Sequence, residues 1–228
     1  MLRICLLPVC NASAFDAPAC NASAFNAPAF DAAADGGRLL RHVSPERRER
    51  ISRLRLPAAK RDSLFGALLV RMAAGRFTGR PPGELEFGAS GAGKPYLIGG
   101  GCFFSLSHTP GLIVCAVSDG ETGADAERVR TPPARVSSRF AEAERLWIGN
   151  SGERFFRVWT RKEAYGKYLG CGISGTLGTD TLDPEISRLL HTFRFGGHVC
   201  SACAADLSDI SAELVSYDDI LEFYGEKT

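Results

Sequence analysis

The stretch that most constrains the fold is an amphipathic helix predicted between Gly152 and Gly170. Apolar side chains recur in it at helical spacing, at Phe155, Phe156, Trp159, Tyr165, Tyr168 and Leu169. Gly170 is a good helix stop. On such a helix Glu163 and Lys167 lie one turn apart on the same face.

Glu163 and Lys167 allow two interpretations. A Glu-x-x-x-Lys pair is most often an ordinary surface ion pair, worth about 0.3 kcal/mol. Here Phe156 and Trp159 share the face of Glu163, so its carboxylate has large apolar neighbours. Because a buried carboxylate needs a cation, a proton or a metal ion nearby, the second interpretation is a functional group.

The composition is that of a globular protein without a strong overall charge. Of the 228 residues, 45% are hydrophobic and 23% are charged, and the length suits one large domain or two small ones. A formal net charge of +1 gives no reason to expect a nucleic-acid partner. Cations gather in one stretch, at Arg38, Arg41, Arg47, Arg48, Arg50, Arg53, Arg55, Lys60 and Arg61. This basic patch is suited to phosphates or to an acidic partner.

The eight cysteines could form disulfides, bind a metal or fill the core. Cys102, Cys115, Cys200 and Cys203 stand in apolar, strand-like runs, where a free cysteine behaves as a small hydrophobic residue. The segment Cys200-Ser-Ala-Cys203 is a single CxxC, and a zinc site is the alternative interpretation. The core interpretation fits a reducing compartment, so we expect a cytoplasmic protein.

The N-terminal region predicts a strand followed by a loop. Its first residues superficially match a signal peptide, but Pro8 interrupts the short apolar run, and a first strand is the better interpretation. No run elsewhere is long enough to cross a membrane. Residues 10–33 contain two copies of a ten-residue repeat, which are too few and too short for a solenoid. We therefore interpret them as an Ala-rich loop.

Caps and periodicity predict the remaining elements. Ser44 and Pro45 form a helix start, and a second helix runs from Pro57 to about Phe77. A tight turn at residues 91–96 presents Lys94. The sequence also predicts strands at 102–106 and 112–117, helical structure at 134–148, and strands at 192–195 and 198–204. A faint repeat of residues 114–119 at 199–206 indicates two similar halves, joined near 119–121.

Two further groups of side chains could carry chemistry. If Asp125 and Glu127 lie on a strand, its period of two directs both carboxylates to one face. Such a pair is a frequent way to offer oxygens to Mg²⁺, although alone it is also common on exposed strands. His108 lies at or next to a strand end, where a histidine is more often structural than functional.

Taken together, these residues meet the requirements of phosphoryl-type transfer. Carboxylates can hold Mg²⁺ against a pyrophosphate, cations can neutralise its oxygens, and a base can take a proton from an attacking hydroxyl. An unrelated Mg²⁺-dependent phosphotransferase is a further possibility, but the sequence has no P-loop or kinase-type glycine loop.

The ordered motifs resemble those of the 4′-phosphopantetheinyl transferase superfamily, and specifically its long, monomeric, surfactin-synthetase-activating type. The resemblance covers roughly residues 38 to 220. It rests on Gly93-Lys-Pro-Tyr96, Phe104-Ser-Leu-Ser-His108, Gly123-Ala-Asp-Ala-Glu127 and Trp159-Thr-Arg-Lys-Glu-Ala-Tyr-Gly-Lys167. Residues 43–50 and 214–220 add to it. Ser105 replaces an Asn frequent in the family, and Ala124 and Ala126 replace larger aliphatic residues.

The resemblance implies an α/β (α+β) fold of two pseudo-symmetric halves, each a small, mainly antiparallel sheet with helices. Residues 1–120 would form the first half and contact the nucleotide of CoA, which would bind in a cleft between the halves. Residues 121–228 would carry the carboxylates and the catalytic pair. The implied reaction moves phosphopantetheine from CoA to a serine of an apo acyl- or peptidyl-carrier protein and releases 3′,5′-ADP.

The resemblance also implies residue roles. Asp125, Glu127 and Glu163 would hold Mg²⁺, Glu163 or a water beside the metal would take the serine proton, and Lys167 would neutralise the leaving phosphate. His108 and Lys94 would contact the 3′-phosphate of CoA. The other expected contacts to CoA are Ser107, Ser63, Arg61, Arg47 and Arg50.

Expected partners are therefore CoA and an apo carrier protein, without nucleic acid or membrane, and the expected state is a monomer. Carrier proteins of this kind are typically acidic, so the arginine-rich helix could serve CoA, the carrier or both. The alternative from another class is a CoA- or nucleotide-binding module without catalysis. The three carboxylates and Lys167 argue against it, because a pure binder needs no base.

Overall fold

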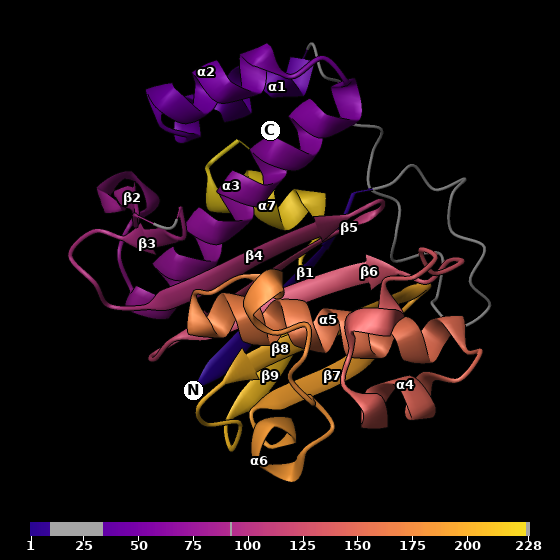
Figure 1. Cartoon of the computed structure of the whole chain (residues 1–228). Coiled ribbons are helices and arrows are strands. Elements are labelled where there is room, and N and C mark those ends of the chain that lie inside the picture. The colour runs from indigo at the N-terminus through magenta and orange to yellow at the C-terminus, as the bar shows by residue number, and fades with distance from the viewer. Residues whose placement is uncertain (10–33, 92, 227–228) are drawn as a thin grey trace.

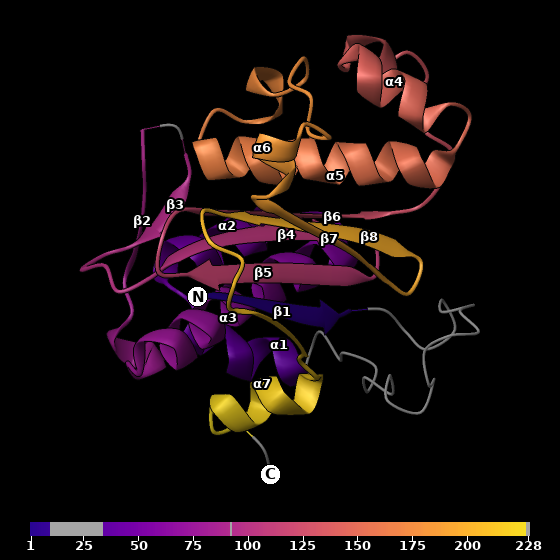
Figure 2. The ribbon, with the colours of Figure 1, turned by 90° about the horizontal axis from the view of Figure 1, so that it is seen from below.

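The computed structural model describes residues 1–9, 34–91 and 93–226, and these residues form layers of helices, sheet, sheet and helices (Figures 1 and 2). The first helical layer holds α1 (Ala34–Leu39), α2 (Pro45–Arg53), α3 (Pro57–Thr78) and α7 (Tyr217–Phe223). The second holds α4 (Glu142–Ile148), α5 (Gly152–Leu169) and α6 (Pro184–Ser187). The tandem repeat lies outside the described residues.

Both sheets consist mainly of antiparallel pairs. The first has the order β4 (Phe103–Thr109), β5 (Leu112–Ser118), β1 (Leu2–Pro8) and β9 (Ile210–Leu214). The second has the order β6 (Thr122–Arg128), β8 (His198–Ala204) and β7 (Leu190–Phe195), all antiparallel. Only β1 and β9 pair in parallel within these sheets as described. The prediction of a mixed fold with small, mainly antiparallel sheets and helices is confirmed.

Small side chains allow the two sheets to pack face to face. The second sheet contributes Ala124, Ala126, Cys200, Ala202 and Ala204 to this contact, and the first contributes Leu2, Ile4, Leu6, Leu112, Val114 and Ala116. Because close packing requires small groups opposite large ones, the two alanines of β6 fit this contact. The outer faces are covered by helices, α3 and α7 on the first sheet and α5 on the second (Figure 2).

The end of the chain returns to the first half of the molecule. Strand β9 extends the first sheet beside β1, and Tyr217, Ile220 and Leu221 of α7 pack in the same core as Leu68 and Met72 of α3. The division of the chain at residues 120 and 121 stays a prediction, and these C-terminal elements lie with the first half.

Local signals placed most helices and strands correctly. The Ser44 hydroxyl accepts a hydrogen bond from the Arg47 amide at 3.3 Å and caps α2, as predicted. Helix α5 ends at Gly170, whose φ of 73° is left-handed and suits a residue without a side chain. The strands predicted at the N-terminus, at 102–106, 112–117, 192–195 and 198–204 are present as β1, β4, β5, β7 and β8, and Asp125 and Glu127 do lie on a strand, β6.

Helical structure at 134–148 was predicted too broadly. Only a 3-10 turn at Ser137–Arg139 and the short α4 form there. Arg135 adopts a left-handed φ of 67°, which breaks a helix before it can include residues 134–136. The sequence interpretation did not predict three strands, the short β2 (Phe87–Ala89) and β3 (Pro95–Leu97) and the mostly exposed β9.

The core interpretation of the cysteines is confirmed for the four named residues. Cys102, Cys115, Cys200 and Cys203 are buried with free thiols. Burial raises the pKa of Cys200 and of Cys203 to about 12, so neither is a ready thiolate ligand. Within the described ranges, no helix is long and apolar enough to cross a membrane.

Candidate active site

The alternation of β6 separates its acidic side chains from its small apolar ones. Ala124 and Ala126 face the other sheet, so Asp125 and Glu127 project to the opposite face, toward α5. Asp125 is only 6% exposed, and Glu127 is half-buried. The predicted placement of both carboxylates on one strand face is present in the structure.

Helix α5 lies directly against β6 because Gly123 has no side chain. A Cβ at Gly123 would stand 1.9 Å from the Ala164 carbonyl oxygen and 2.6 Å from the Tyr168 amide nitrogen. No other residue fits such a contact without moving the helix. The close approach brings Glu163 and Lys167, one turn apart on α5, over the carboxylate face of β6.

Lys167 bonds to the strand rather than to Glu163. Its Nζ donates to Asp125 Oδ1 at 2.9 Å and to the Ala124 carbonyl oxygen at 2.8 Å. The simple Glu163–Lys167 surface pair, one of the two sequence interpretations, is therefore not the arrangement observed. An ammonium group has three donors, and these two bonds use two of them.

Asp125 is held by one oxygen and open at the other. Ser107 Oγ donates to Oδ1 at 2.8 Å, beside the bond from Lys167. Oδ2 is buried and has no hydrogen-bond partner among the described residues. Burial raises the pKa of Asp125, although Lys167 and Ser107 act in the opposite direction. The free oxygen of a buried carboxylate is a place where a cation would be stabilised.

Glu163 completes a group of three mutually repelling carboxylates. Its pKa is raised first by burial and then by the charges of Asp125 and Glu127, while Lys167 lowers it. Glu127 pairs with Arg130 at 2.9 Å. A carboxyl group with a raised pKa in this setting is a stronger base than an ordinary glutamate.

The donor set fits a hard divalent cation by its chemistry. All three groups offer carboxylate oxygens, which Mg²⁺ prefers, and Asp125 Oδ2 lacks any other partner among the described residues. In the structure Lys167 forms an ion pair with Asp125, and Arg130 forms one with Glu127. Within the described ranges, no three His, Cys, Asp or Glu side chains lie close enough together to hold a metal ion.

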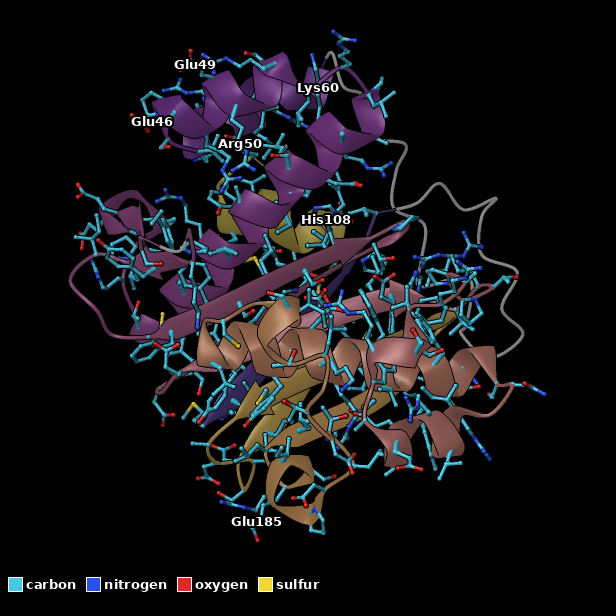
Figure 3. The ribbon with its side chains drawn as sticks, viewed as in Figure 1. Glu46, Glu49, Arg50, Lys60, His108 and Glu185 are labelled. Atoms are coloured by element: carbon cyan, nitrogen blue, oxygen red, sulfur yellow. The ribbon has the colours of Figure 1, made fainter. Side chains whose placement is uncertain are left out.

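The residues expected to contact CoA come from several elements of the first half. Lys94 lies in the turn between β2 and β3 and pairs with Glu121 at 2.5 Å, at the entry to β6. His108 is exposed on β4, and in the view of Figure 3 it lies between the layer that carries Arg50 and the layer of α5. Ser107 is buried and bonded to Asp125.

The remaining expected CoA contacts lie on the first helical layer. Arg47 and Arg50 are on α2, and burial, followed by the charge of Arg50, lowers the pKa of Arg47. Arg61 pairs with its neighbour Asp62 at 2.9 Å on α3, and Ser63 is half-buried beside them. Between these four expected residues and the carboxylates of β6 and α5, no hydrogen bond or ion pair is formed in the described structure.

A buried ion pair next to the site was missed by the sequence reasoning. Lys162 Nζ lies 2.6 Å from Glu144 Oε2, and both side chains are 0% exposed. Lys162 also bonds the Thr176 and Thr179 carbonyl oxygens, and Glu144 accepts from the amide and hydroxyl of Thr181. The pair ties α4 and the segment after α5 to the residue preceding Glu163. The sequence signal for this buried pair was Lys162 itself, a charged residue among the apolar positions of the predicted helix.

Comparison with known proteins finds similarity to 4′-phosphopantetheinyl transferases. The family model described as "4′-phosphopantetheinyl transferase superfamily" matches residues 121–202. A 4′-phosphopantetheinyl transferase of Bacillus subtilis is 29% identical over 62% of this chain and 66% of its own length. The 4′-phosphopantetheinyl transferase psf-1 of Bacillus pumilus is 32% identical over 61% of this chain and 63% of its own length. The chain thus spans just under two thirds of these two relatives.

A longer match has lower identity. The 4′-phosphopantetheinyl transferase Sfp of Bacillus subtilis (strain 168) is 24% identical over 81% of this chain and 92% of its own length. The match to the family model includes both strand β6 and helix α5, which carry the acidic group described above.

Proposed function

Because the chain belongs to the 4′-phosphopantetheinyl transferase superfamily, with Sfp- and psf-1-like relatives, we propose that it transfers 4′-phosphopantetheine from CoA to a carrier-protein serine. The observation that carries the proposal is the position of Asp125, Glu163 and Lys167. A buried carboxylate with a free oxygen, a carboxyl group of raised pKa and an ammonium group meet at the contact of β6 and α5.

In the proposed reaction Glu163 is the general base. The serine hydroxyl of the carrier gives its proton to the Glu163 carboxylate, and the serine oxygen forms a bond to the β-phosphorus of CoA. The bond from that phosphorus to the bridging oxygen breaks, and its electron pair leaves with 3′,5′-ADP.

Lys167 and the acidic residues provide the electrostatic part of the mechanism. Lys167 would keep its bonds to β6 and direct its remaining donor at the charge that grows on the leaving phosphate. Asp125, Glu127 and Glu163 would hold Mg²⁺, which when bound supplies positive charge to the pyrophosphate oxygens.

The two halves would have different roles in the proposed reaction. Residues 1–120, with the returning β9 and α7, would bind CoA through Lys94, His108, Arg47, Arg50, Arg61 and Ser63. Residues from 121 onward would supply the carboxylates and Lys167. The arginine-rich α2 would also suit an acidic apo carrier protein. Within this proposal the protein acts in the cytoplasm as a monomer.

The proposal is tested by incubating the protein with fluorescent CoA, Mg²⁺ and a panel of apo carrier proteins, and reading labelled carrier on a gel. We expect labelling that EDTA abolishes. Glu163→Gln should lower the rate by at least about 100-fold, as expected for loss of a general base. Glu185→Gln is the matched control, because Glu185 is exposed on α6 (Figure 3), where it forms an ion pair with Arg188.

The alternative function is a CoA-binding module without catalysis. In that case the protein would bind CoA in a direct binding measurement but label no carrier, and Glu163→Gln would bind CoA as the unaltered protein does. Near-normal labelling by Glu163→Gln would instead contradict the role of Glu163 as base.

A further inference from the structure

The two sheets are joined at β4 and β6 by side-chain hydroxyl groups. Ser105 Oγ accepts from the Ala124 amide at 2.9 Å, Ser107 Oγ from the Ala126 amide at 3.3 Å, and Thr109 Oγ1 from the Arg128 amide at 3.2 Å. In each case the two residues are 19 positions apart in the chain. The constant separation means that β4 and β6 run in the same direction, and we call these three contacts the hydroxyl seam.

The hydroxyl seam satisfies backbone donors that have no strand beside them in their own sheet. Strand β6 is at the edge of its sheet, and alternate amides along an edge strand point away from the neighbouring strand. A buried amide without a partner would cost about 1 to 3 kcal/mol. Ser105, Ser107 and Thr109 are themselves 4–8% exposed, so water does not replace them easily.

Ser107 differs from the other two members because it also contacts Asp125. Its hydroxyl oxygen accepts from the Ala126 amide and its single proton is donated to Asp125 Oδ1 at 2.8 Å. Lys167, on α5, donates to the same oxygen. Asp125 Oδ1 is thus fixed from both halves of the molecule, while Oδ2 stays without a partner among the described residues.

We propose, on the premise of the transferase function above, that Ser107 is a positioning residue, which holds Asp125 so that Oδ2 is left for the divalent cation. The hydroxyl proton of Ser107 is committed to Asp125 and does not bind the nucleotide of CoA. This assignment replaces the nucleotide contact that the family resemblance implied for Ser107, and it leaves His108 and Lys94 for the 3′-phosphate.

The test compares Ser107→Ala with Ser105→Ala, which removes one seam contact and does not touch Asp125. Binding of Mg²⁺ in the presence of CoA is measured by calorimetry, and again with 3′-dephospho-CoA. We expect Ser107→Ala to weaken Mg²⁺ binding about 10-fold or more, as for loss of a partner of a metal ligand. The loss should be the same with both nucleotides. Ser105→Ala should bind Mg²⁺ normally.

Ser107→Thr retains the hydroxyl and should recover most of the Mg²⁺ affinity. Such a recovery would show that the loss in Ser107→Ala comes from the missing hydroxyl and not from a general folding defect. Thermal unfolding of Ser105→Ala and Ser107→Ala shows the loss of one seam contact that these two variants share. The proposal would be overturned if the effect of Ser107→Ala disappeared with 3′-dephospho-CoA, or if Ser105→Ala weakened Mg²⁺ binding equally. Absence of carrier labelling by the unaltered protein would contradict the proposed function, whereas these binding measurements address Ser107 alone.

Discussion

Lys167 Nζ lies 2.9 Å from Asp125 Oδ1 and joins two elements that are 42 residues apart in the chain. The side chain of the lysine is 29% exposed and that of the aspartate 8%, so the pair is partly shielded from water. It is the direct link between helix α5 and the acidic face of β6. Its removal should affect both stability and transfer.

Lys167→Met should lower the free energy of unfolding by about 1 to 2 kcal/mol at neutral pH, because the buried Asp125 keeps only the bond from Ser107. Carrier labelling should also be lost. Urea denaturation measures the first effect. In the double variant Lys167→Met with Asp125→Asn, part of the stability should return since the unpaired charge is gone. A double variant no more stable than Lys167→Met would contradict this account.

Glu163→Gln should stabilise the protein while it abolishes transfer. Burial and neighbouring charges raise the pKa of Glu163, so the folded state of the unaltered protein loses stability as pH rises through that value. At pH 8 without Mg²⁺ the variant should therefore have the higher Tm, by roughly 2 °C. Below the ordinary pKa of a glutamate, where this group is protonated in both the folded and the unfolded state, the difference should vanish. A lower Tm for the variant at pH 8 would oppose this prediction.

Gly123→Ala should reduce both stability and transfer, because its Cβ would collide with the backbone of α5 at Ala164. Overpacking of this kind costs about 1 to 3 kcal/mol or more. Gly120→Ala is the control, since a Cβ there meets nothing within 4 Å. Thermal unfolding and carrier labelling of both variants test the prediction, and equal behaviour of the two would contradict it.

Lys162→Met should be among the most destabilising single changes near the site. It leaves Glu144 fully buried without its direct ion-pair partner, at a cost of about 3 to 5 kcal/mol. Adding Glu144→Gln should restore part of the loss, because Gln keeps an acceptor for Thr181 without the charge. A double-mutant cycle by urea denaturation measures the coupling. A coupling near zero would show that the pair does not stabilise the fold.

The elements of the site could be predicted because their signals are local. The Ser44 cap, the Gly170 stop and the apolar stripe of α5 each lie within a few residues of the structure that they specify. The alternation of β6 likewise placed Asp125 and Glu127 on one face. Strand β9 could not be found in this way, because it is mostly exposed and its pairing with β1 joins the two ends of the chain.

The sequence by itself thus determined which helices and strands form, and which acidic and basic groups each of them carries. Only the tertiary structure decided their partners: Lys167 bonds to Asp125 instead of Glu163, Ser107 bonds to Asp125, and Lys162 bonds to Glu144. The physical reason is the distance along the chain over which each kind of interaction acts. Caps and periodicity act between near neighbours, whereas these partners depend on how closely packed layers approach, as α5 approaches β6 at Gly123.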